Sequence, residues 1–139
     1  ECIFFGANRA ILNLQRCILY IMSCLFNSMH FFLPELSSGD IRNKICDYIQ
    51  NNGALVDGLK TSEIVKMEGG NYIQNMRSPS TWGGAIEIQS ACNIWQWRII
   101  VKNFRDRNGT SIEFIPVSSN YTKTIQLEWT GGHYEPVRI

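Results

Sequence analysis

The sequence lacks several features by which protein classes are recognised. It has five cysteines, an odd number, and no two of them stand in the C-x-x-C spacing of a zinc site. This composition therefore indicates neither a disulfide framework nor a structural metal. Reduced thiols in a cytosol-like compartment fit the cysteine count better, and we expect no metal ion and no cofactor.

Charged residues are few and scattered. They make up 18% of the 139 residues and leave a net charge of +1, so the basic stripe that nucleic acid or an anionic membrane surface requires is missing. An apolar run at 17–26 is shorter than the roughly 20 residues that span a bilayer and indicates a buried helix. The length fits one domain over 1–139, and the missing initiator Met suggests a fragment or an excised domain.

Hydrophobic spacing divides the chain into a helical first part and a β-rich second part. Apolar residues at helical spacing predict a long helix that begins directly after Cys2. Shorter helices are expected at 41–49, 61–67, 71–76 and 82–95. Strands of period two are expected at 97–104, 111–117 and 124–130, with Asn108-Gly109 marking a hairpin turn. Helices followed by an antiparallel-rich sheet make an α+β fold.

The two ends of the chain carry a candidate thiol site. Cys2 stands at the start of the expected long helix, where free backbone N–H groups favour a thiolate and can donate to an oxyanion. Near the other end, Gly131-Gly132 turns the chain into a strand on which His133 and Glu135 share one face. Glu135 can then orient the His133 imidazole as the base for a thiol. On residue types alone, a buried structural cysteine and a plain surface His–Glu pair are the commoner arrangements.

Three segments resemble sequence blocks of the ovarian tumour (OTU) family of cysteine proteases. "ECIFFGANRAI" is similar to the catalytic block, which runs Asp-Gly-Asn-Cys, an apolar residue and an aromatic. "STWGGAIEIQSACNIWQWRIIV" and "TIQLEWTGGHYEPV" are similar to the central and terminal blocks. The resemblance implies a papain-like α+β domain with N-terminal helices packed on a mostly antiparallel central sheet. The chain begins just before Cys2, without the Asp-Gly that helps to form the oxyanion hole in the family.

The resemblance also implies a function. Such a domain is a deubiquitinase, a thiol peptidase that hydrolyses the (iso)peptide bond after the C-terminal Gly of ubiquitin or a ubiquitin-like modifier. It implies Cys2 as nucleophile and His133 as base, with Glu135 where the family usually has Asp or Asn. Trp82 and Trp129 are candidates to line the channel for the modifier's tail, and both also fit core positions. The expected partners are ubiquitin and its conjugates.

Several alternatives stay open at this point. Another papain-like thiol hydrolase would share Cys2 and His133, and a ubiquitin-binding pseudoenzyme would keep the fold without the chemistry. The expected state is a monomer in the cytoplasm, or in the host cytosol if the source is a virus or a bacterium. We expect His30 to be structural and Glu87 to cap its helix or pair locally.

Overall fold

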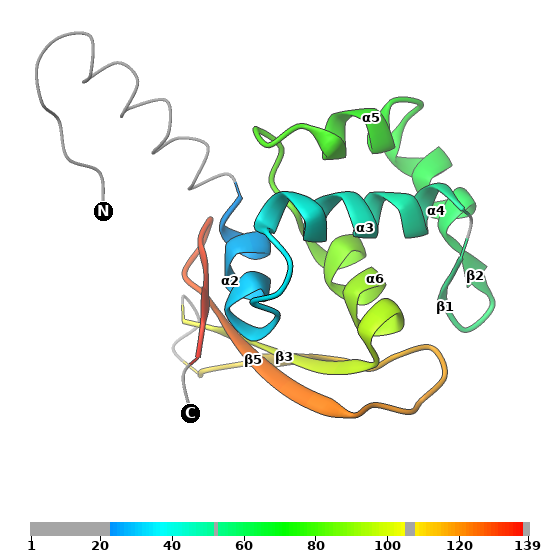
Figure 1. The fold of residues 1–139 in the computed structure, drawn as a ribbon. Coiled ribbons are helices and arrows are strands. Elements are labelled where there is room, and N and C mark those ends of the chain that lie inside the picture. The colour runs from blue at the N-terminus through cyan, green and yellow to red at the C-terminus, as the bar shows by residue number, and fades with distance from the viewer. Residues whose placement is uncertain (1–22, 52, 105–107, 138–139) are drawn as a thin grey trace, which may run out of the picture.

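The computed structural model describes residues 23–51, 53–104 and 108–137, which form helices packed on one face of a sheet (Figure 1). The helices are α2 (Cys24–Phe32), α3 (Ser38–Gln50), α4 (Thr61–Glu68), α5 (Tyr72–Arg77) and α6 (Ala85–Trp95). The strands are β1 (Ala54–Val56), β2 (Leu59–Lys60), β3 (Trp97–Asn103), β4 (Ser111–Phe114), β5 (Lys123–Trp129) and β6 (Tyr134–Pro136). Cys2 and most of the helix expected after it lie outside the described residues.

Local side-chain caps explain where the helices begin. The Ser37 hydroxyl accepts a hydrogen bond of 3.0 Å from the Asp40 N–H and starts α3, as the "SSGD" segment predicts. The Glu87 carboxylate accepts one of 2.7 Å from the Gly84 N–H and starts α6, which confirms its expected capping role. At α4 the sequence suggests Thr61 or Ser62 as the cap, but the N-cap is Lys60, one residue earlier. Thr61 is already helical and donates to the Ile49 carbonyl at 2.8 Å.

The larger sheet has the strand order β4-β3-β5-β6 and is mixed. The β3–β4 hairpin around Gly109 is antiparallel, as expected, and β6 is antiparallel to β5. The longest pairing, between β3 and β5, is parallel. Two of the three pairings in this sheet are thus antiparallel, as the resemblance implies, and the third is parallel because the chain does not return beside β4. The connection at 115–122 crosses the end of β3, held by hydrogen bonds to Gln89 and Asn93 of α6 and to its C-cap residue Gln96.

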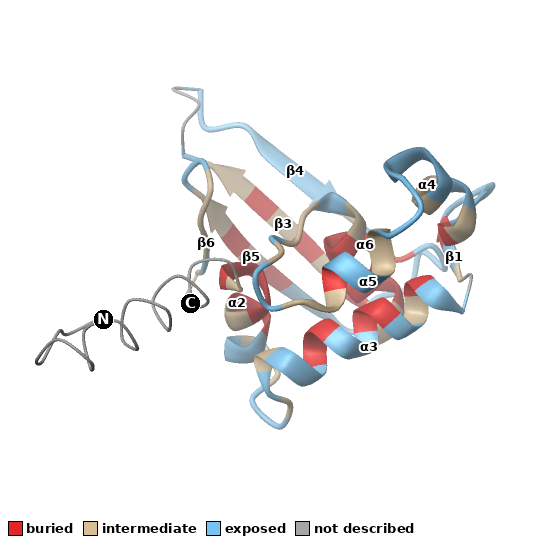
Figure 2. Ribbon diagram, turned by 90° about the horizontal axis from the view of Figure 1, so that it is seen from above, coloured by how far each residue is buried: buried red, intermediate tan, exposed pale blue. Residues whose placement is uncertain are grey.

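The core lies between the sheet and the helices. Helices α2 and α6 cover the sheet, and α3 packs across both of them (Figure 1). Figure 2 shows buried residues on the inner sides of these helices and along β3 and β5. Phe26, Met29, Ile45, Ile99 and Leu127 are among the residues that are fully enclosed. In the part of the chain that the structure describes, no helix is both long and apolar enough to cross a bilayer.

Candidate active site

A pocket of about 400 Å³ is lined by the start of α2 and by β6. The contacting residues Cys24 and Tyr134 of these elements are 110 positions apart in the sequence. Cys24 and Ser28 line it from α2, and His133, Tyr134 and Glu135 line it from the last strand. The remaining lining residues are Asn27, His30, Phe31 and Pro136. The pocket therefore brings together a thiol, an imidazole that can act as its base and a carboxylate that can orient the imidazole.

Cys24 is the first residue of α2, so its thiol lies at the positive end of the helix. The side chain is buried, and its Sγ accepts a hydrogen bond of 3.3 Å from the backbone N–H of Tyr134. Burial raises the pKa of the Cys24 thiol above its ordinary value, and the hydrogen bond from Tyr134 opposes that rise. A neighbouring base is needed to remove the proton at neutral pH.

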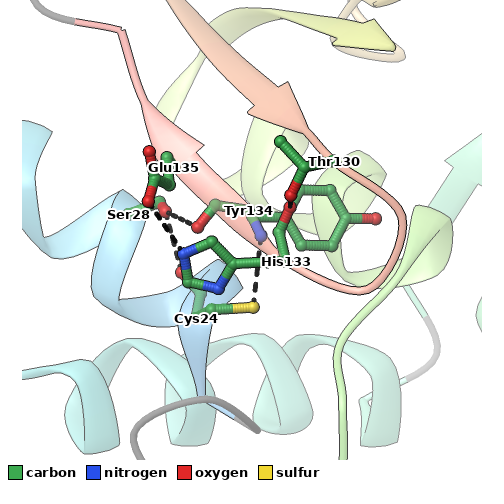
Figure 3. A network of polar contacts seen from close by, with 6 residues as sticks. All are labelled: Cys24, Ser28, Thr130, His133, Tyr134 and Glu135. Carbon is green, nitrogen blue, oxygen red and sulfur yellow. Dashed lines mark hydrogen bonds and ion pairs between the residues drawn. The ribbon is translucent and has the colours of Figure 1, made fainter. Parts of the chain in front are cut away.

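His133 lies at the turn that enters β6 and lines the same pocket as Cys24. Its Nε2 is 3.1 Å from Oε1 of Glu135, so the structure brings together the pair that the i, i+2 spacing predicts. Figure 3 shows the imidazole between Glu135 and Cys24, with the second ring nitrogen on the side of the thiol. When Nε2 is protonated and donates a hydrogen bond to Glu135, Nδ1 is unprotonated and can accept the proton of Cys24.

A buried arginine supports the segment that carries Cys24. Arg42 of α3 is 3% exposed, and its guanidinium lies 4.2 Å from the centroid of the Phe26 ring. It donates to the carbonyls of Met76 and Thr81 at 2.8 Å each and to the Ser23 hydroxyl at 3.2 Å. Both neighbours of the Cys24-Leu25 segment are therefore fixed by one side chain from the next helix.

The two tryptophans singled out in the sequence occupy different surroundings. Trp82 is 50% exposed and lies against Gly132, the residue before His133. Trp129 is half-buried and packs against the core. It lines a second, apolar pocket of about 230 Å³, which shares Tyr134 with the first. The structure thus places Trp82 beside the turn of His133 and Trp129 in the neighbouring pocket.

Two other polar residues have local partners. Buried Glu87 accepts a hydrogen bond of 2.5 Å from the Tyr72 hydroxyl in addition to its cap, and desolvation raises the pKa of its carboxyl. His30 lines the main pocket but holds the Leu36 carbonyl through Nδ1 at 2.5 Å, in keeping with a structural part. Within 23–51, 53–104 and 108–137, no three His, Cys, Asp or Glu side chains gather in a way that would hold a metal ion.

Cys24 is not among the site residues predicted from the sequence, although the sequence carries a signal for it. Cys24-Leu25-Phe26 follows the same order of Cys, apolar residue and aromatic as Cys2-Ile3-Phe4. Neither cysteine directly follows the Asn of the family block, because Glu1 precedes Cys2 and Ile21-Met22-Ser23 precedes Cys24. The feature that separates the two is position, since Cys24 shares a pocket with His133 and Cys2 lies outside the described residues.

Comparison with known proteins agrees with this geometry. The family model of the OTU-like cysteine protease matches residues 21–134, a range that includes Cys24 and His133 and begins after Cys2. Ubiquitin thioesterase OTU1 of Mus musculus is 28% identical over 124 residues, which cover 84% of this chain and 33% of the relative. Ubiquitin thioesterase otu2 of Schizosaccharomyces pombe is 28% identical over 128 residues, covering 81% of this chain and 41% of the relative. The chain thus spans about a third to two fifths of the length of these curated relatives.

Solved structures share the fold. An ovarian tumour (OTU) domain in complex with ubiquitin superposes with a TM-score of 0.65 at 21% identity, covering 82% of this chain and 62% of that one. The viral OTU domain protease from Dera Ghazi Khan virus superposes with a TM-score of 0.63 at 23% identity, covering 82% and 72%. The α+β fold that the resemblance implied is therefore confirmed.

Proposed function

Because the chain belongs to the family of OTU-like cysteine proteases, we propose that it is a deubiquitinase. It hydrolyses the (iso)peptide bond after the C-terminal Gly of ubiquitin or a ubiquitin-like modifier. The observation that carries the proposal is the pocket in which Cys24, His133 and Glu135 meet. Relatives named ubiquitin thioesterases, and a solved OTU domain in complex with ubiquitin, support the choice of substrate.

In the proposed reaction, the Nδ1 atom of His133 takes the proton of Cys24 as its Sγ attacks the carbonyl carbon of the modifier's last Gly. Backbone N–H groups at the start of α2 are suited to stabilise the oxyanion that forms. His133 then gives the proton to the leaving amine, and a thioester with Cys24 remains. Water hydrolyses this thioester with His133 again as base. Glu135 holds the imidazole and stabilises its charged form.

We propose Cys24 rather than Cys2 as the nucleophile. The support is twofold: Cys24 lies in the pocket of His133, and the family match includes Cys24 and leaves out Cys2. The role assigned to Cys2 by the first sequence block is the competing proposal. Variants of the two cysteines separate them directly.

We further propose that Trp82 lines the channel for the modifier's tail, because its exposed indole stands beside the turn of His133. Trp129 can contact the tail only if the tail also reaches the apolar pocket that Trp129 and Tyr134 line. We also propose that the protein is a monomer and works in a reducing, cytoplasmic compartment. The free thiols of Cys24, Cys46 and Cys92 support that compartment.

The test is covalent labelling with ubiquitin that carries an electrophile at its C-terminus. Intact mass should report one ubiquitin adduct, and peptide mapping should place it on Cys24. The adduct should be lost in Cys24→Ala and His133→Ala and be retained in Cys2→Ala. The matched control is Cys92→Ala, which removes a buried thiol away from the pocket. An adduct that persists in Cys24→Ala and disappears in Cys2→Ala would overturn the assignment of the nucleophile.

A ubiquitin-binding pseudoenzyme is the second candidate. The observation in its favour is that Ile21-Met22 stands where the family block has Asp-Gly, which helps to form the oxyanion hole. A pseudoenzyme would bind ubiquitin, measured by titration with labelled ubiquitin, without forming an adduct. The deubiquitinase should form the adduct and release product from a fluorogenic ubiquitin amide.

A further inference from the structure

Tyr134 turns both of its backbone polar groups toward α2. Its N–H donates to the Sγ of Cys24 at 3.3 Å, and its carbonyl oxygen is 3.0 Å from the hydroxyl of Ser28 (Figure 3). Cys24 and Ser28 are four residues apart, so they lie on one face of the helix. One residue of the edge strand β6 is therefore held at two points by two side chains of α2.

Ser28 is enclosed in this contact. It is 2% exposed, and its hydroxyl lies 2.8 Å from the Cys24 carbonyl as well as 3.0 Å from that of Tyr134. A serine inside a helix commonly donates to the carbonyl four residues back, which explains the first distance. It does not explain the second, which joins the helix to a strand 106 positions away. The hydroxyl has one proton, and it can donate that proton to either carbonyl.

The two carbonyls belong to the two segments that carry the proposed chemistry. Cys24 supplies the thiol, and Tyr134 stands between His133 and Glu135. We propose that Ser28 is a positioning residue, whose hydroxyl fixes the strand of the base against the helix of the nucleophile. This inference rests on the proposed function, because it assigns Ser28 a part in that reaction.

The second point of attachment matters most during turnover. While Cys24 is a thiol or a thiolate, its sulfur accepts the N–H of Tyr134. Acylation of the sulfur removes the negative charge that makes it a good acceptor, so this hydrogen bond weakens. The contact between Ser28 and Tyr134 involves no reacting atom and persists in the thioester. It keeps His133 in place for the water that must attack next, and small misplacements of such groups are costly.

The experiment compares Ser28→Ala with Ser90→Ala. Ser90 is also fully buried, and its hydroxyl donates to the Ile86 carbonyl at 2.8 Å, the same four-residue contact inside a helix. Ser90 lies on α6 and not in the pocket of His133. Both variants lose one buried hydroxyl, so a merely structural role lowers the unfolding midpoint in both and leaves kcat unchanged in both.

With a fluorogenic ubiquitin amide, we expect Ser28→Ala to lower kcat about tenfold with KM nearly unchanged. Ser90→Ala should keep the kcat of the unaltered protein. Ser28→Thr, which retains the hydroxyl, should recover most of the lost rate and keeps the test open if Ser28→Ala fails to fold. A kcat for Ser28→Ala within twofold of that for Ser90→Ala would overturn the inference.

A second readout needs no substrate and separates this inference from the proposed function. Amide hydrogen exchange of Tyr134, followed by NMR, should be faster in Ser28→Ala than in Ser90→Ala, because one of the two attachments of the strand is lost. If the unaltered protein shows no hydrolysis, the proposed function fails while this measurement still reports the attachment. Equal exchange in the two variants would show that Ser28 does not hold the strand.

Discussion

The indole of Trp82 packs on Gly132, so closely that a Cβ added to the glycine would lie 3.4 Å from the indole ring. Gly132 also has a φ of +126°, which L side chains rarely adopt. The residue before His133 is therefore fixed both by its backbone angle and by a neighbouring aromatic side chain. The Gly131-Gly132 pair sets the direction in which His133 enters the pocket.

Gly132→Ala should lower kcat, beyond the loss of stability that an alanine at a positive φ causes elsewhere in the chain. The strained φ costs about 1–3 kcal/mol, and the backbone can relieve that strain by rotating His133 away from Cys24. The matched control is Gly69→Ala, since Gly69 has a φ of +105° with open space around its Cβ position. Both variants should lower the unfolding midpoint, measured by circular dichroism, while Gly132→Ala alone should lower kcat, about tenfold or more. A kcat equal to that of Gly69→Ala would show that the turn does not position the base.

Gly83→Ala should destabilise the protein. An added Cβ would lie 2.7 Å from Cδ2 of Leu25 and 2.9 Å from Cζ of Phe26, both of them fully buried side chains that cannot move aside freely. We expect a loss of about 1–3 kcal/mol in the free energy of unfolding, measured with urea. Gly84→Ala is the control, because nothing lies within 4 Å of its Cβ position. Equal losses in the two variants would contradict the close packing of the Trp82-Gly83 segment on α2.

Glu135→Gln should lower kcat less than His133→Ala does. The carboxylate acts through the imidazole, and an amide oxygen can still accept the hydrogen bond that Glu135 makes at 3.1 Å. Loss of the base should cost about 10²–10⁴-fold, and loss of the carboxylate's charge should cost less. Steady-state kinetics at saturating fluorogenic ubiquitin amide give both values. Equal effects would assign Glu135 a more direct part than orientation.

Stability should fall as the pH rises above 9, through the buried thiols. Burial raises the pKa of Cys46 to about 11 and that of Cys92 to about 12, from 9.0. Above pH 9 the unfolded chain loses these protons while the folded protein keeps them, so ionisation favours unfolding. Each thiol should cost about 1 kcal/mol between pH 8 and pH 10. Urea unfolding under reducing conditions measures the loss, and the double variant Cys46→Ala/Cys92→Ala should show a weaker pH dependence than the unaltered chain.

Periodicity predicted the helices and strands well and their arrangement only in part. The clean alternation at Ile125, Leu127 and Trp129 identifies β5, and the cap at Glu87 identifies α6. The same alternation cannot say which strand lies next to β5. That choice follows from side chains of α6 that hold the connection after β4, and such contacts between distant segments leave no periodic pattern. The short β1–β2 hairpin was not predicted, because its strands have three and two residues.

The candidate site was predictable at one end of the chain and ambiguous at the other. His133 and Glu135 lie two residues apart, so strand geometry alone brings them onto one face. Cys24 and Cys2 both precede an apolar residue and an aromatic, and only tertiary structure indicates which thiol faces a base. Arg42 and Ser28 gave no signal at all, because a buried Arg and a buried Ser acquire their parts only when the helices pack.

The distance in sequence between Cys24 and Tyr134, 110 positions, has a consequence for folding. Contacts between distant segments form late, since the long intervening chain must be ordered before they are favourable, and the central parallel pairing of β3 with β5 adds to this delay. We therefore expect the thiol and the imidazole to meet late in folding. We expect an incompletely folded chain to lack the assembled pocket, so that the return of the proposed hydrolysis on refolding would report completion of the fold rather than the formation of its helices.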